Sequence, residues 1–120
     1  MLVKMHMKKH ANFLNATPAA VEQVLLQLGR NIRTARLRRK LRISDLADRV
    51  GVSRYTMSDV EKGKPSVGIG VYVGALWVLG LVEEMHNIAD PDRDTQGKAL
   101  ESVHSPKTAA KRKKDLDNDF

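Results

Sequence analysis

The chain has 120 residues, a net charge of +7, a pI of about 9.9 and no cysteine. This length suits one domain with tails, and the lack of cysteine excludes disulfide frameworks, thiolate catalysis and cysteine-based zinc sites. The positive charge favours a polyanionic partner such as nucleic acid, but it fits a solvated basic protein equally well.

Residues 1–16 are predicted to form a flexible basic arm, because they lack a sustained hydrophobic period. They also lack the apolar segment of a secretory signal, so we expect a cytoplasmic protein. His6 and His10 lie four residues apart, a spacing that would suit a metal on a helix. A disordered tail explains them better, and we expect no metal site.

A first helix is predicted from Thr17 to about Lys40. Thr17 is a good N-cap, and Pro18 suits the first helical position. The second half of this segment is strongly basic and contains no acidic residue. Apolar residues recur through the segment at helical spacing: Val21, Val24, Leu25, Leu28, Ile32 and Ala35.

Two short helices follow, joined by a glycine turn. The first is predicted at 43–50, and Gly51 then ends it in left-handed geometry. Ser53 can cap the next helix, which turns Met57 and Val60 inward. A glycine turn of this kind gives a large crossing angle, so the second helix projects from the body. A projecting polar helix on a basic domain suits the major groove of DNA.

The remaining chain is predicted to form a helix capped by Ser66 and ending near Leu79, then a fifth helix over 81–89 with Ile88 on its apolar side. The uncharged run 67–82 is shorter than the roughly 20 apolar residues that a spanning helix needs, so we expect no membrane insertion. The tail after residue 89 is expected to be disordered.

The stretch LRISDLADRVGVSRYTMSDVEKGKPS resembles the helix-turn-helix core of the phage-repressor-like (XRE, Cro/C1-type) regulators. The resemblance covers about residues 28–85. It implies an all-α, five-helix domain that binds DNA as a dimer, and hence a palindromic operator in double-stranded DNA. The positions that carry the match are Leu46, Ala47, Gly51, Ser53, Met57, Val60, Glu61 and Gly63.

The resemblance also assigns roles to single residues. Arg36 and Glu61 correspond to an internal ion pair. The implied base-reading residues are Arg54, Tyr55, Ser58 and Asp59, and the implied phosphate contacts are Arg42, Ser44, Ser53, Lys62 and Lys64. Instead of reading a base, Asp59 could pair with Lys62, or repel phosphate and so select against some sequences.

The sequence departs from this family at one functional position. Family members often begin the second helix with a Thr-Gln pair that grips the DNA backbone, whereas this chain has Arg42 and Ile43 there. Either the N-cap moves to Ser44, or Arg42 supplies the charge.

The stretch from Ser66 to Glu101 is similar to HipB-like antitoxins, the XRE regulators encoded beside HipA-type kinase toxins. This similarity implies repression of the chain's own operon and binding of a HipA-like kinase toxin. We expect a DNA-binding and dimerisation domain at 17–89 and a C-terminal tail at 90–120. The tail either orders on a partner kinase, serves as a degradation signal, or stays solvated.

An interface with a second copy or another partner is predicted on the helices far from the DNA end. Its residues are Tyr72, Trp77, Leu81 and Met85, although Trp77 fits a core position as well. A stand-alone regulator without a toxin, or a protein-interaction module, are the alternatives. No nucleophile–base pair, phosphate loop or ligand cluster is visible, so we expect no catalytic residues, no cofactor and no enzyme activity.

Overall fold

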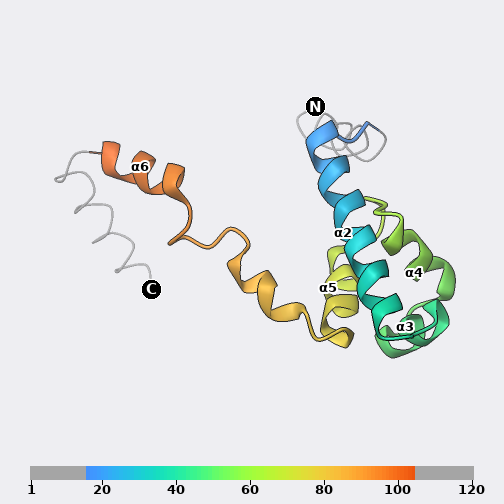
Figure 1. Ribbon diagram of the computed structural model, residues 1–120. Helices are drawn as coiled ribbons and strands as arrows, with labels where there is room; N and C mark the ends of the chain where they lie inside the picture. The colour runs from blue at the N-terminus through green and yellow to red at the C-terminus, as the bar shows by residue number, and fades with distance from the viewer. Residues whose placement is uncertain (1–15, 105–120) are drawn as a thin grey trace, which may run out of the picture. The chain divides into compact units, whose positions relative to one another are not determined.

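The computed structural model describes residues 16–104, and within that range the chain is helical and contains no strand. The predictions for the basic arm up to residue 15, including His6 and His10, and for the tail from residue 105 lie outside the described residues. Figure 1 labels the α-helices, which are α2 (Ala19–Arg38), α3 (Ile43–Val50), α4 (Arg54–Glu61), α5 (Ile69–Val78) and α6 (Thr95–Val103), and a 3-10 helix η1 spans Val82–Asn87.

The chain divides into two compact units, one ending at Glu83 and the other beginning at Glu84. The first unit holds the buried core. The largest of its fully buried side chains are Ile32 from α2, Leu46 from α3, and Met57 and Val60 from α4. Because one small aliphatic cluster joins three helices, the orientation of α4 depends on its packing against α2 and α3.

α2 differs from the predicted first helix at both ends. It begins at Ala19 with Pro18 as the N-cap residue and no side-chain cap hydrogen bond, and it ends at Arg38. The predictions that Thr17 caps it and that Pro18 is its first residue are therefore wrong. Of the apolar residues at helical spacing, Val24 is 67% exposed, whereas Leu25 and Leu28 are half-buried. The buried positions of α2 begin at Gly29.

The predicted helix-turn-helix is confirmed in α3 and α4. Gly51 ends α3 with φ 86°, and the Val52 N–H donates to the Ala47 carbonyl at 3.0 Å. Glycine carries no Cβ, so it adopts this left-handed conformation without strain. Arg42 is the N-cap residue of α3, and its backbone N–H donates to the Asp45 carboxylate at 2.9 Å. The N-cap therefore does not move to Ser44.

The segments after α4 correct the sequence prediction. α5 begins at Ile69 with Gly68 as N-cap and no side-chain cap hydrogen bond, so Ser66 does not cap it. The predicted fifth α-helix is the shorter 3-10 helix η1, which contains no buried residue. Ile88, expected on its apolar side, is 68% exposed. Val82 and Met85 of this segment are half-buried.

The second unit contains α6, where the sequence predicted a disordered tail. The Asp94 carboxylate accepts from the Gly97 N–H at 2.8 Å, so a side-chain cap begins this helix. Lys98 Nζ donates to the Asp92 carbonyl at 2.6 Å. α6 has no buried residue, and Leu100 and Val103 are exposed. Disorder is therefore a wrong prediction for residues 95–103.

Candidate nucleic-acid interface

The start of α4 is fixed by a local cap. Ser53 Oγ accepts from the Thr56 N–H at 3.1 Å, and the Ser53 and Thr56 hydroxyl oxygens lie 3.0 Å apart. This cap satisfies one of the free N–H groups at the helix N-terminus. Ser53 was expected to contact phosphate, but its oxygen is engaged within the helix cap.

The outer face of α4 presents Arg54 and Tyr55 to solvent. Tyr55 is 75% exposed, and the Arg54 guanidinium carbon lies 5.6 Å from the centre of the Tyr55 ring. This distance is within the range of a cation–π contact, which limits the freedom of two long side chains. Ser58 and Asp59, one turn later, are half-buried. Two of the four predicted base readers, Arg54 and Tyr55, are thus exposed.

The inner face of α4 is tied to α2 by a buried ion pair. Arg36 Nε donates to Glu61 Oε2 at 2.7 Å, and Arg36 Nη2 donates to Glu61 Oε1 at 2.9 Å. Arg36 Nη1 donates to the Leu41 carbonyl at 2.9 Å. The hydrogen bond to Glu61 raises the pKa of Arg36; burial lowers it, and the charge of Glu61 raises it further. The structure therefore brings together the two residues that the resemblance pairs, and Arg36 faces inward.

Two glycines allow α2 and the end of α4 to approach closely. A Cβ at Gly29 would lie 2.6 Å from the Glu61 carbonyl oxygen and 2.7 Å from that of Val60. Gly63 has φ 70°, and a Cβ there would clash with the backbone of Leu25. Backbone atoms cannot move aside as a side chain can. Sequence reasoning missed the role of Gly29, although an isolated glycine within a helical pattern signals such an approach.

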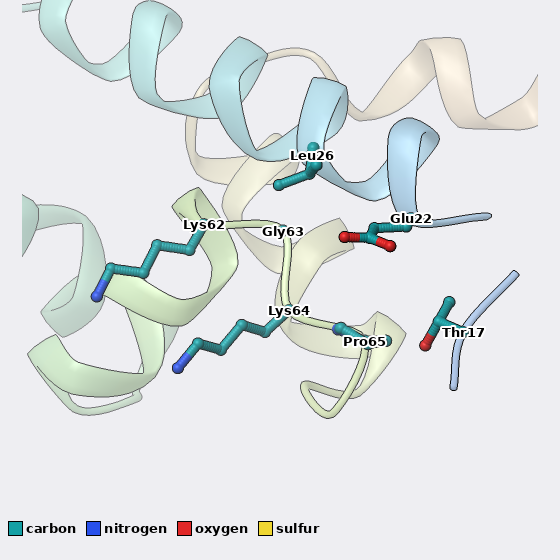
Figure 2. Close-up of a pocket in the computed structure, with 7 residues that line it drawn as sticks. All are labelled: Thr17, Glu22, Leu26, Lys62, Gly63, Lys64 and Pro65. Carbon is teal, nitrogen blue, oxygen red and sulfur yellow. The ribbon is translucent and has the colours of Figure 1, made fainter. Parts of the chain in front are cut away.

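The loop after α4 displays two lysines on a fixed backbone. Figure 2 shows the side chains of Lys62 and Lys64 extending to the same side of this loop, and both are exposed. Gly63 between them lies against α2 beside Leu26. Tyr72 Oη donates to the Lys64 carbonyl at 2.7 Å. Both cations are thus presented on one side of a loop that is anchored from α5.

The sequence predicted Tyr72 at an interface. In the structure it is instead a core residue that is 3% exposed. Its ring lies inside because it joins α5 to the loop, and its hydroxyl serves as the donor described above. Burial raises the pKa of Tyr72, and the charge of Asp59 raises it further. The hydroxyl consequently keeps its proton and remains a hydrogen-bond donor.

Asp59 pairs with Lys64, and not with Lys62 as one prediction held. Lys64 Nζ lies 3.2 Å from Asp59 Oδ1, and both side chains are partly exposed. The Lys64 N–H also donates to the Asp59 carbonyl at 3.0 Å. The adjacent Lys62 makes no ion pair within residues 16–104.

Two of the residues predicted to contact phosphate, Arg42 and Ser44, lie at the beginning of α3. Arg42 is exposed, and its Nε lies 3.7 Å from Asp45 Oδ2, a loose pair in water. Ser44 is half-buried in the first turn. Arg42 can therefore turn toward an anion at little cost.

The basic run of α2 divides by position. Arg36 is buried, and Arg39 Nη1 donates to the Ala35 carbonyl at 2.9 Å. Arg30, Arg33 and Arg38 are exposed and make no ion pair with any described residue. They contribute a positive field around the domain.

The other predicted interface residues differ in exposure. Trp77 is 66% exposed, which excludes its placement in the core of this chain. Leu81 and Met85 are half-buried. A hollow lined by Arg49, Trp77 and Val78 lies beside the indole ring. Ile69, two turns before Trp77 on α5, is 72% exposed.

Residues 27–87 match the family described as a helix-turn-helix domain. Because the match spans about half of the chain and includes α3 and α4, the chain belongs to this family, a DNA-binding class. No curated protein and no solved structure matches the chain. In residues 16–104 no helix is long and apolar enough to cross a membrane, and no group of three or more acidic or histidine side chains there could hold a metal ion.

Proposed function

We propose that this chain is a sequence-specific repressor in the cytoplasm that places α4 in the major groove of its own operator. The observation that carries the proposal is the exposed Arg54–Tyr55 pair at the N-terminal end of α4. The inner face of the same helix is held by Met57, Val60 and Glu61. Arginine can pair bidentately with guanine, and a tyrosine ring can contact a thymine methyl group.

Backbone contacts would position α4 without reading sequence. Lys62, Lys64 and Arg42 are exposed cations at the two ends of the helix-turn-helix, and Ser44 lies beside Arg42. Ser58 and Asp59 are proposed as further base readers one turn along α4. Because Ser53 Oγ is engaged in the helix cap, the backbone N–H of Ser53 is the more suitable donor to a phosphate.

The repressor would act as a homodimer through the apolar side of α5. Ile69 and Trp77 are exposed there, with half-buried Val73 between them at a spacing of four residues. Leu81, half-buried after the end of α5, is proposed as part of the same interface, and Met85 of the second unit as a further contact. A two-fold dimer would present two copies of α4 about 34 Å apart, the repeat of B-DNA, and would thus favour a palindrome.

A second candidate role is that of antitoxin to a HipA-like kinase. The similarity of residues 66–101 to HipB-like proteins motivates it, and the exposed Leu100 and Val103 of α6 favour it, because a nine-residue helix without packing is marginal in water. Co-purification with a kinase encoded by the adjacent gene tests it. A stand-alone regulator predicts no such neighbour, and clean separation of the two proteins would contradict the antitoxin role.

Duplexes selected from a random library test the repressor proposal. Binding should weaken steeply with salt, because phosphate contacts release counterions. Arg54→Ala should lower affinity for the selected duplex about 5- to 150-fold, which corresponds to about 1–3 kcal/mol.

Arg30→Ala is the matched control, since it removes the same charge from an exposed position on α2. Equal losses for the two variants, or equal binding of random and selected duplexes, would contradict base reading.

Sedimentation of Trp77→Glu tests the proposed dimer. A monomer is expected, and an unchanged dimer would exclude the apolar side of α5 as the interface.

A further inference from the structure

We propose that Asp59 sets DNA specificity by restraining the charge of Lys64. The inference rests on the proposed function, because it concerns how the α4 surface discriminates between duplexes. It differs from a base contact alone, since it makes one carboxylate control a phosphate contact made by another residue.

The two residues are held together by more than their ion pair. The Lys64 N–H donates to the Asp59 carbonyl at 3.0 Å, and Tyr72 Oη donates to the Lys64 carbonyl at 2.7 Å. Gly63 presses the same loop against α2. The 3.2 Å pair between Lys64 Nζ and Asp59 Oδ1 therefore forms on a fixed backbone, which lowers its entropic cost.

Asp59 is also the acidic group of α4 that reaches solvent. The side chain of Glu61, the other acidic residue of the helix, is only 7% exposed. Arg36 donates a hydrogen bond to each of its carboxylate oxygens, so its charge is neutralised within the fold. The side chains of Asp59 and Lys64 are 36% and 50% exposed. The pair thus lies at the surface that α4 would bring to DNA. There each side chain can exchange its partner for a group of the DNA.

When the protein encounters a random duplex, the ion pair between Asp59 and Lys64 is intact. Lys64 can then contact phosphate only by leaving Asp59, and the freed carboxylate faces an anionic polymer without a donor. A cytosine in the major groove changes the balance, because its N4 amino group donates to a carboxylate. Asp59 would then be satisfied by the base, and Lys64 would be released to the phosphate backbone.

Asp59→Asn tests this mechanism, since it removes the charge and keeps the shape. On a random duplex the variant should bind more tightly at low salt. One additional lysine acting on phosphate should steepen the slope of log affinity against log salt by up to about 0.9. Affinity would then fall up to about 3.5-fold more than that of the wild type between 50 and 200 mM salt, as follows from that slope. The variant should also lose preference for cytosine at one position of each half-site.

Asp48→Asn is the control, because Asp48 is an exposed acidic residue on α3 that makes no ion pair within residues 16–104. It should leave the slope unchanged. The gain seen with Asp59→Asn should disappear when Lys64→Gln is present in both compared proteins. Asp59→Ala provides a second neutral variant, and circular dichroism verifies that each protein is folded.

The outcomes separate the two proposals. A wild-type protein that binds DNA without salt dependence overturns the proposed function itself. Normal binding with Asp59→Asn and Asp48→Asn alike overturns only the inference. A gain from Asp59→Asn that persists in the Lys64→Gln background also overturns it, because the carboxylate would then act by direct repulsion. A gain that requires Lys64 supports it.

Discussion

The two faces of α4 differ in almost every physical respect. On the inner face, Met57 and Val60 are fully buried and Glu61 is hydrogen-bonded to Arg36. On the outer face, Arg54 and Tyr55 contact each other and are otherwise exposed to solvent. The helix is thus fixed by one face, so the fold places little constraint on the residues of the other. Stability and DNA binding should therefore respond to different substitutions.

The largest loss of stability is expected at the ion pair between α2 and α4. Glu61→Gln leaves the Arg36 guanidinium buried without a countercharge, and breaking a buried pair costs about 3–5 kcal/mol. Chemical denaturation measures this loss. The double variant Arg36→Met with Glu61→Leu should recover much of the stability. Equal losses in the single and double variants would contradict the assignment of the loss to an unpaired charge.

A second large effect is expected at the closest approach of the two helices. Gly29→Ala forces a Cβ against the carbonyl oxygens of Val60 and Glu61, and such overpacking costs about 3 kcal/mol. Gly70→Ala is the matched control in α5, where a Cβ meets no atom within 4 Å. It should stabilise the protein by about 0.5–1 kcal/mol, because alanine favours a helix. Thermal unfolding compares the two, and similar shifts would contradict the close approach.

A moderate effect is expected at the cap between the faces. Ser53→Ala removes the acceptor of the Thr56 N–H and should cost about 1 kcal/mol. Ser53→Gly should cost only a few tenths of that amount, since glycine tolerates the cap geometry. Denaturant midpoints measure both variants, and an unchanged midpoint for Ser53→Ala would show that the cap adds nothing to stability.

An effect of about the same size as that of the cap is expected at Tyr72, the tyrosine that anchors the lysine loop. The pKa of Tyr72 is raised in the folded chain above its ordinary value of 10.0, so its contribution is present below pH 10 and is lost as pH rises through the native pKa. Tyr72→Phe should cost about 1 kcal/mol at neutral pH through the lost hydrogen bond to the Lys64 carbonyl. The variant should also lose less stability than the wild type above pH 10; parallel curves would contradict the raised pKa.

The sequence predicted the helices whose signals are local and strong. Three signals agree at α3 and α4 and identify both helices. They are the turn at Gly51, the cap at Ser53 and the spacing of Met57 and Val60. The start of α2 was misplaced because two competing N-cap positions are adjacent. α6 was missed because its cap, Asp94, lies within a polar segment without apolar periodicity.

The candidate site was predictable in its residues but not in its contacts. The exposed Arg54 and Tyr55 follow from the helical pattern, and the resemblance names both partners of the Arg36–Glu61 pair. The pairing of Asp59 with Lys64 does not follow, because it depends on how the glycine turn directs the chain. The burial of Tyr72 likewise depends on tertiary packing, since aromatic residues suit a core and an interface equally.

Photo-crosslinking from position 55 tests most directly whether the outer face of α4 reads DNA while α5 does not. A benzophenone side chain replaces Tyr55 in one sample and Trp77 in another, each with a selected duplex. Crosslinks from position 55 to bases of the duplex, together with crosslinks from position 77 only to protein, are the predicted result. DNA crosslinks from position 77 with none from position 55 would contradict the account.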